Sequence, residues 1–233
     1  MQINIYQLIK GARKATGLTV VIDVFRAFSL ACYVTAKGVK DLVPVGDMDT
    51  AYRLKEQNPD FLLIGERGGI IQPGFDYGNS PHSIAEVDFT GKTVVHTTSA
   101  GTQGIANARN ADEMITGSFV NAQAIIDYIR MKNPAEVSLV CMGWAGEEHA
   151  DEDTLFAEYV KDVLEGKRVD FSKIVHYLRN ESKTGTFLDT RDAASAPPQD
   201  FDLCLDLDRF DFVLRVEPYK DDLVRLQKIE ISK

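Results

Sequence analysis

Two short stretches of similar sequence set the pattern of this chain. Residues 16–23 read TGLTVVID, and residues 90–97 read TGKTVVHT. In each stretch a Thr-Gly pair leads into a short run rich in β-branched apolar residues, which predicts a buried strand. The two stretches start 74 residues apart (90 − 16 = 74). We therefore expect two similar units, one beginning at each strand.

Apolar strands alternate with helical patterns along both units. Strands are expected at residues 19–22, 41–45, 61–64, 93–96, 113–116 and 137–141, and helices at 27–37, 48–57, 101–108, 121–131 and 153–164. This alternation predicts an α/β fold, with helices on both faces of a sheet in three α/β/α layers. The sheet should be largely parallel, with a mixed sheet as the alternative.

A second repeat follows the first. Asn58-Pro59 recurs as Asn133-Pro134, an offset of 75 residues (133 − 58 = 75). Internal duplication and convergence on similar turns explain this equally well. If the chain is duplicated, its two units pack side by side in one sheet. We expect a single domain over residues 1–233, with units at about 16–89 and 90–166 and a C-terminal segment, 167–233, packed on the core.

Composition narrows the function class. The chain has 233 residues, 44% of them hydrophobic and 26% charged, with a formal net charge of −9. This charge argues against a nucleic-acid partner, because general affinity for nucleic acid needs a basic surface. No run approaches the roughly 20 apolar residues of a membrane span, so we expect no membrane partner. Cys32, Cys141 and Cys204 show no paired spacing and the N-terminus lacks a secretory signal, which indicates a cytoplasmic protein.

Polar residues follow the predicted strands directly. Asp23 and Arg26 follow the first strand, and GERGG at 65–69 follows the third. TTSAGT at 97–102 follows the first strand of the second unit, and a polar stretch at 143–153 follows the last. Because ligands bind beyond the carboxyl ends of the strands in open α/β sheets, these four loops predict one shared site.

The loop at 65–81, GERGGIIQPGFDYGNSP, mixes five glycines and two prolines with apolar residues. Glycines let the backbone approach a ligand closely. We interpret the loop as a rigid ligand cradle that Phe75 anchors to the core. The alternative is a structural loop in which Glu66 and Arg67 pair with each other. The residues of this loop predicted to bind substrate are Gly68, Gly69, Asn79 and Ser80.

Two other motifs each have a structural and a functional interpretation. Asp23 either caps the following helix or acts as a metal ligand or nucleophile. TTSAGT is either a capped helix start or a cradle for an anion at a helix N-terminus. In the functional interpretation, the substrate-binding residues of this turn are Thr97, Thr98, Ser99, Gly101 and Thr102.

Carboxylates without a paired His or Cys favour a hard cation such as Mg²⁺ over zinc. Glu152 and Asp153 stand at the entrance of the helix predicted at 153–164. Acids in the first turn also stabilise a helix through its dipole, which is the structural alternative. The predicted ligands of Mg²⁺ are Asp23, Asp76, Glu152 and Asp153.

The motifs DVFRA, GERGG, GFDYGNSP, TTSAGT, GSFVNA and EDT occur in this order along the chain. Together they resemble the 2-phosphosulfolactate phosphatase family over residues from about 19 to 164, and CLDLDRFDFVLRVEP is similar to the closing segment of that family. The resemblance implies an α/β/α fold and a Mg²⁺-dependent phosphatase of coenzyme M biosynthesis. The implied substrate is (2R)-2-phospho-3-sulfolactate, which is hydrolysed to 3-sulfolactate and phosphate. With the apolar tail, the resemblance also makes a homodimer an expectation.

On this interpretation a small phosphorylated anion binds among four catalytic residues, Asp23, Arg26, Glu66 and Arg67. The two guanidinium groups offer planar forks for oxyanions. Arg67 is expected to face the ligand more freely, so Lys should be the more damaging there. A protein that binds a phosphate or sulfonate metabolite without hydrolysis is one alternative. A lyase or transferase acting on a phosphorylated hydroxy acid is another.

Overall fold

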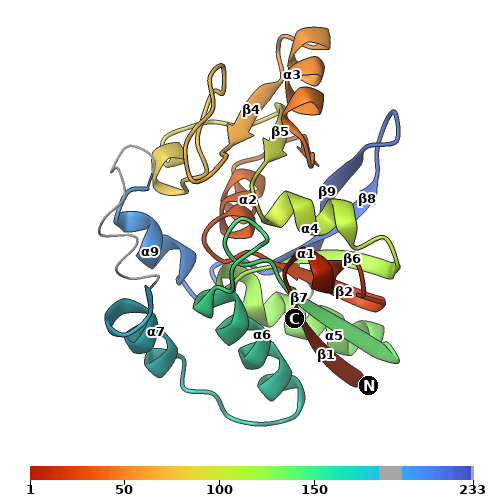
Figure 1. Ribbon diagram of the computed structural model, residues 1–233, viewed down its shortest axis with the longest axis vertical. Helices are drawn as coiled ribbons and strands as arrows, with labels where there is room; N and C mark the ends of the chain where they lie inside the picture. The colour runs from red at the N-terminus through yellow and green to blue at the C-terminus, as the bar shows by residue number, and fades with distance from the viewer. Residues whose placement is uncertain (184–195, 232–233) are drawn as a thin grey trace.

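The computed structural model describes residues 1–183 and 196–231 (Figure 1). The strands are β1 (Gln2–Gln7), β2 (Gly17–Ile22), β3 (Asp41–Pro44), β4 (Leu62–Gly65), β5 (Thr93–Thr97), β6 (Ala111–Gly117), β7 (Glu136–Cys141), β8 (Phe212–Pro218) and β9 (Val224–Glu230). The helices are α1 (Leu8–Ala12), α2 (Ala27–Ala36), α3 (Met48–Gln57), α4 (Gly101–Asn107), α5 (Ala122–Lys132), α6 (Asp151–Leu164), α7 (Phe171–Asn180) and α9 (Gln199–Cys204), with 3-10 turns η1 (His82–Ile84) and η2 (Phe119–Asn121). Within these described ranges, no helix combines the length and apolar character that crossing a membrane requires.

The strands form two sheets. The larger is six-stranded in the order β1-β7-β2-β6-β8-β9, and the smaller is three-stranded in the order β3-β5-β4. The smaller sheet is wholly parallel, whereas β8 runs antiparallel to both β6 and β9 in the larger one. The predicted α/β fold with a largely parallel, mixed sheet is therefore confirmed.

The two repeated stretches, β2 and β5, lie at the centres of different sheets. β2 pairs with β6 and β7, which follow β5 in the chain. β5 pairs with β3 and β4, which follow β2. Each predicted unit thus places its first strand between the second and third strands of the other. The expectation that the units lie side by side in one sheet is wrong, because pairing between the units replaces pairing within them.

Helices cover both faces of the six-stranded sheet, which gives the expected three layers there (Figure 1). Successive side chains of a strand point to opposite faces. On β2, Val20 and Ile22 pack into the apolar cluster that contains residues of α5 and α6. Val21, between them, packs into the cluster that contains residues of α2 and α4. A strand buried on both faces reads as a continuous apolar run, which is why TVVI predicted it.

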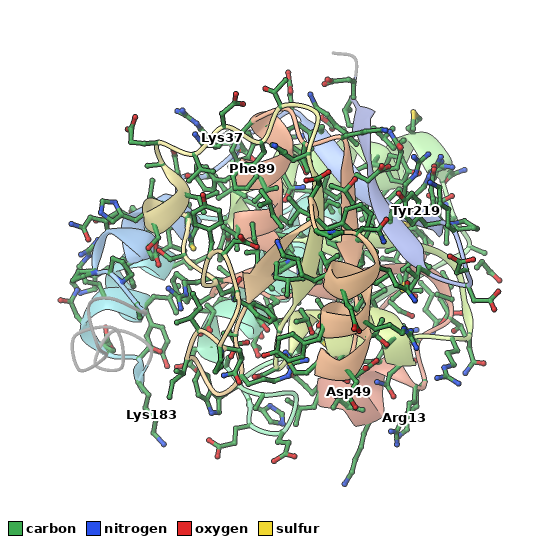
Figure 2. All side chains as sticks on the ribbon, turned by 90° about the horizontal axis from the view of Figure 1, so that it is seen from above. Arg13, Lys37, Asp49, Phe89, Lys183 and Tyr219 are labelled. Atoms are coloured by element: carbon green, nitrogen blue, oxygen red, sulfur yellow. The ribbon has the colours of Figure 1, made fainter. Side chains whose placement is uncertain are left out.

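The three-stranded sheet and α3 lie at one end of the molecule (Figure 1). Val43, Leu63 and Val95 pack with Ala51 and Leu54 of α3. The alternate residues of the same strands join the cluster that contains α2, so α2 lies between the two sheets. Seen from above, side chains fill the space around this helix, with the fully buried Phe89 among them (Figure 2).

Candidate active site

The loops that follow β2, β4, β5 and β7 enclose a small pocket of about 30 Å³. Two of these strands belong to each sheet, so the pocket lies where the two sheets meet. Its lining, among the described residues, is Asp23, Phe25, Arg26, Glu66, Gly69, Asn79, Ser99, Ala100, Gly143, Trp144 and Ala145. The four loops converge on one pocket, as expected, while its function and the chemical roles of its residues stay predictions.

Asp23 both caps helices and faces the pocket. Its Oδ1 accepts the N–H of Ala27 at 3.0 Å, and its Oδ2 accepts the N–H of Gly101 at 2.8 Å. These are the first residues of α2 and α4, so one carboxylate satisfies the N-termini of two helices. The pKa of Asp23 is raised to about 7, mainly by burial and in addition by the charges of Glu66 and Glu152, while the two N–H bonds act in the opposite direction.

GERGG forms a tight two-residue hairpin. Arg67 and Ile70 exchange backbone hydrogen bonds of 3.0 and 3.1 Å around Gly68 and Gly69. Both glycines have positive φ, +59° and +81°, which this turn requires and which side chains other than glycine rarely adopt. The Gly-Gly pair is therefore fixed by the backbone, and it holds Glu66 at the mouth of the hairpin.

The Glu66 carboxylate joins this hairpin to the TTSAGT turn. Its Oε2 accepts the N–H of Gly69 at 2.7 Å, and its Oε1 accepts the N–H of Ser99 at 2.7 Å. The Ser99 hydroxyl also donates to Glu66 Oε2 at 3.0 Å and accepts from Gly68 N–H at 2.9 Å. Glu66 is buried, so these bonds fix the loops after β4 and β5 against each other.

Asp153 joins the other two loops in the same way. Its carboxylate oxygens accept the N–H groups of Val24 and Gly143, each at 2.8 Å, from the loops after β2 and β7. Burial, followed by the charges of Glu152 and Asp23, raises the pKa of Asp153 well above its ordinary value. Buried acids thus fasten all four loops, and the repulsion between them contributes to the raised pKa values of Asp23 and Asp153.

Arg26 lines the pocket and is buried. Its Nη1 lies 2.5 Å from Oδ2 of Asp200, a fully buried residue of α9. Asp200 was missed in the sequence, because PPQDFDLC carries no motif and only the tertiary fold brings it near DVFRA.

The end of the long loop also reaches the site. Asn79 lines the pocket, and its Oδ1 lies 3.4 Å from Nε2 of His96. Ser80 is absent from the described lining of the pocket, and its hydroxyl donates to Asp200 Oδ1 at 3.0 Å. Burial, together with the charge of Arg67, lowers the pKa of His96 to about 4, so this ring is neutral at pH 7. His96 was missed too, although an unpaired His at the end of an apolar strand is a visible signal.

Of the TTSAGT residues predicted to bind substrate, Ser99 alone is in the described lining of the pocket. Its neighbour Ala100, which was not predicted, also lines it. The hydroxyls of Thr98 and Thr102 accept each other's backbone N–H groups at 3.2 and 2.9 Å. Thr97 accepts from Arg67 at 2.6 Å. The threonines thus shape the turn, and the structure favours the capped helix start for them.

Arg67 and Asp76 do not join the pocket. The Arg67 guanidinium donates to the carbonyls of Glu66 and Gly46 and to the hydroxyl of Thr97, at 2.7, 3.2 and 2.6 Å. These bonds hold it away from the pocket, so the structure does not have Arg67 facing a ligand freely, as the sequence led us to expect. It forms no ion pair with the Glu66 carboxylate among the described contacts. Asp76 accepts from Leu63 N–H at 2.8 Å and pairs with Lys55 at 3.4 Å, because the loop folds back along β4.

Whether the pocket can hold Mg²⁺ depends on the carboxylates that line it. Over residues 1–183 and 196–231, no three or more His, Cys, Asp or Glu side chains are grouped so as to hold a metal ion. Mg²⁺, however, commonly binds one or two carboxylates and completes its shell with water and substrate phosphate. Asp23 and Glu66 fit that arrangement, because both line the pocket and a cation would relieve the repulsion that raises the pKa of Asp23.

Trp144 forms the wall opposite GERGG. It is the single Trp of the chain and is 37% exposed. A Cβ added to Gly69 would lie 3.3 Å from the end of its ring, so the two loops are in close contact across the pocket. The pocket, at about 30 Å³, has room for about two water molecules. A lone Trp after a glycine in a polar loop could have been found in the sequence.

A larger hollow of about 430 Å³ lies between α3, α4 and the β8–β9 hairpin. Thr102 is the one predicted site residue in its lining. Its charged groups are Asp47, Asp222, Arg53 and Arg109, which balance one another. We take the smaller pocket as the candidate active site, because it combines convergent polar groups with a buried acid, Asp23, whose pKa is perturbed.

The chain was compared with known proteins. The family model described as 2-phosphosulpholactate phosphatase matches residues 3–218. A "Probable 2-phosphosulfolactate phosphatase" of Bacillus subtilis is 30% identical over 220 residues, which cover 93% of this chain and 94% of the relative. A protein with the same name from Thermoplasma volcanium is 32% identical over 198 residues, which cover 85% of this chain and 88% of the relative. Another, from Caldicellulosiruptor saccharolyticus, is 40% identical over 149 residues, which cover 62% of this chain and 61% of the relative.

Proposed function

Because the chain belongs to the 2-phosphosulfolactate phosphatase family, we propose that it hydrolyses (2R)-2-phospho-3-sulfolactate to 3-sulfolactate and phosphate, with Mg²⁺. The observation that carries the proposal is the pocket at the junction of the two sheets, where Asp23, Glu66 and Arg26 meet. On the same resemblance we propose that the reaction belongs to coenzyme M biosynthesis, and on the unpaired spacing of the cysteines we propose that it takes place in the cytoplasm.

Charge balance supports the requirement for Mg²⁺. The substrate carries a phosphate, a carboxylate and a sulfonate, and it must enter beside Asp23 and Glu66. Arg26 lines the pocket, but it is already paired with Asp200. A divalent cation between the carboxylates and the phosphate would turn this repulsion into attraction. Asp23 and Glu66 would hold the ion, which would supply charge neutralisation at the transferring phosphoryl group.

The protein's own groups would bind and orient the substrate. Arg26 offers N–H donors to an oxyanion, and the Asn79 amide and Ser99 hydroxyl line the same pocket. The bonds from Glu66 and Asp153 to backbone N–H groups keep the four loops at fixed separations. Phosphoryl transfer depends mainly on such positioning and on charge stabilisation, so a site built this way suits it.

A phosphate-release assay tests the proposal. The purified protein is incubated with 2-phospho-3-sulfolactate or 2-phosphoglycolate, in Mg²⁺ or in EDTA. We expect phosphate release in Mg²⁺ alone, with the sulfonated substrate preferred. Asp23→Asn should abolish turnover, because it removes a charge from the centre of the pocket.

Asp76→Asn is the matched control, since that carboxylate lies outside the pocket beside Lys55. It should keep turnover and metal dependence. Ligand-induced melting shifts without phosphate release from either ester would contradict the proposal and favour a binding protein. Equal turnover in Mg²⁺ and in EDTA would contradict the metal requirement.

A further inference from the structure

Helix α9 (Gln199–Cys204) carries an aspartate into the interior beside the pocket. Asp200 is 0% exposed and is 174 residues from Arg26 along the chain. It is absent from the described lining of the pocket. Burying an unpaired carboxylate is strongly unfavourable, so the groups that surround it account for its position.

Three donors surround the Asp200 carboxylate. Oδ2 accepts from Nη1 of Arg26 at 2.5 Å. Oδ1 accepts from the hydroxyl of Ser80 at 3.0 Å and from the backbone N–H of His82 at 2.9 Å. The two oxygens therefore hold two different segments, DVFRA after β2 and the end of the long loop after β4.

Both segments carry a residue of the pocket. Arg26 lines it directly, and Asn79 lines it one residue before Ser80. Beside the ion pair, Phe25 stacks on Phe201 of α9 with ring centroids 5.6 Å apart. Two adjacent contacts, one ionic and one aromatic, thus fix DVFRA to α9.

We propose that Asp200 is a positioning residue, which holds the Arg26 guanidinium and the Asn79 segment in the orientation that binds the oxyanion of the substrate. The inference rests on the proposed phosphatase function. An Arg side chain has several rotatable bonds, and the orientation of its planar fork decides how many N–H donors meet a phosphate. A carboxylate outside the pocket fixes that orientation without repelling the substrate at close range.

A purely structural ion pair makes a different prediction. Its loss would lower the melting temperature, while the folded protein would keep its affinity for anions and its kinetic constants. The two roles therefore separate in measurements made below the melting transition.

The test replaces Asp200 by Asn, which keeps the shape and the acceptor for Ser80 but removes the charge that faces Arg26. Asp202→Asn is the matched control, on the same helix, where the side chain is 72% exposed and pairs with Arg179. Two quantities are measured: kcat/KM for phosphate release, and the affinity for inorganic phosphate from the fluorescence of Trp144. Trp144 is the single Trp of the chain and lines the pocket, so its emission reports on this site.

We expect Asp200→Asn to lower kcat/KM by about ten- to a hundredfold, the loss that corresponds to one charge-assisted hydrogen bond. Phosphate affinity should fall in the same variant, and Asp202→Asn should change neither quantity. Wild-type phosphate affinity and kcat/KM in folded Asp200→Asn would overturn the inference. So would a wild-type protein whose fluorescence does not respond to phosphate, because Arg26 would then bind no anion.

A second comparison covers failure of Asp200→Asn to fold. Arg26→Gln/Asp200→Asn removes both charges and leaves no unpaired ion buried, and it is compared with Arg26→Gln alone. If Asp200 acts through Arg26, the double variant should match the single one in kcat/KM within about threefold, since coupled residues are not additive. A further tenfold loss would overturn the inference. If the wild type hydrolyses no ester, the phosphatase proposal fails, and the fluorescence titrations still decide the role of Asp200.

Discussion

Replacing each of two arginines by Lys gives the sharpest test of the site, because the sequence and the structure rank them oppositely. GERGG made Arg67 the expected ligand group. The structure instead points its guanidinium at Gly46, Thr97 and the backbone of Glu66, and places Arg26 in the pocket lining. Arg26→Lys should therefore damage catalysis, and Arg67→Lys should mainly damage stability.

The magnitudes follow from the contacts. Lys at position 26 keeps a positive charge for Asp200 but loses the planar fork, and one lost charge-assisted bond is worth about 1.5–3 kcal/mol. This corresponds to about ten- to a hundredfold in kcat/KM. The three bonds that the Arg67 guanidinium donates are charge-assisted, but the group is only half-buried and its acceptors are uncharged, so we count about 0.5–1.5 kcal/mol for each. An ammonium that keeps one of them loses about 1–3 kcal/mol of stability, which lowers Tm by about 2–4 °C per kcal/mol in a chain of this size.

Steady-state phosphate release gives kcat/KM, and thermal unfolding of the same preparations gives Tm. Arg67→Lys should keep kcat/KM within about threefold, because its head group lies outside the pocket lining. A larger catalytic loss in Arg67→Lys than in Arg26→Lys, with Tm unchanged, would refute the reasoning. It would restore Arg67 as a substrate ligand and imply that GERGG reorients when substrate binds.

Three further predictions follow from the acids and glycines of the site. The folded pKa of Asp23, about 7, lies above its ordinary 3.8, so the stability it contributes when protonated is complete below about pH 4 and is lost as the pH rises towards 7. In metal-free buffer, the melting temperature of Asp23→Asn should rise relative to that of the wild type between about pH 4 and pH 7. A difference in melting temperature that stays constant over this range would disprove the raised pKa. EDTA should abolish turnover, and added Mg²⁺ or Mn²⁺ should restore it. The Mg²⁺ concentration needed for half-maximal turnover should rise more in Asp153→Asn than in Asp151→Asn. Equal Mg²⁺ titration curves for the two variants would contradict a metal at this end of α6. Gly68→Ala and Gly69→Ala both place Ala at positive φ, but only the Cβ at position 69 would contact the Trp144 ring. The Trp144 fluorescence should therefore shift in Gly69→Ala alone. A shift in both variants would contradict the described packing of Gly69 against Trp144.

The local pattern of the sequence was enough for the elements that depend on near neighbours. The helix expected at 48–57 is α3 (Met48–Gln57), since its apolar spacing and its capping Asp47, which accepts from Thr50 N–H at 2.7 Å, are local features. The strands at TVVI and TVVH were equally visible, because both faces of each are buried. β1 (Gln2–Gln7) was not visible, since it is a half-buried edge strand that only pairing with β7 defines.

The site divides in the same way. That polar loops follow the strands, and that Asp23, Glu66 and Ser99 should line one site, was expected from the sequence. A shared sheet edge explains only part of this, because β2 lies in one sheet and β4 and β5 lie in the other, and the meeting of the two sheets brings the loops together. The exclusion of Asp76 did not follow, since it depends on the loop folding back to pair Tyr77 with Ile64. The same holds for Arg67, whose direction is set by acceptors on Gly46 and Thr97.

By itself, the sequence determined the alternating α/β pattern, the loops that carry the chemistry and the family to which they belong. Only the tertiary structure decided which strands pair, and so placed β2 among β6 and β7 and β5 among β3 and β4. It also set the charges that matter, since the pKa of Asp23 depends on burial and on the nearby Glu66 and Glu152, and the position of Arg26 depends on Asp200. The physical reason is range: propensity and periodicity act over one turn or one strand, whereas burial, pairing and electrostatic interaction join residues that are distant along the chain.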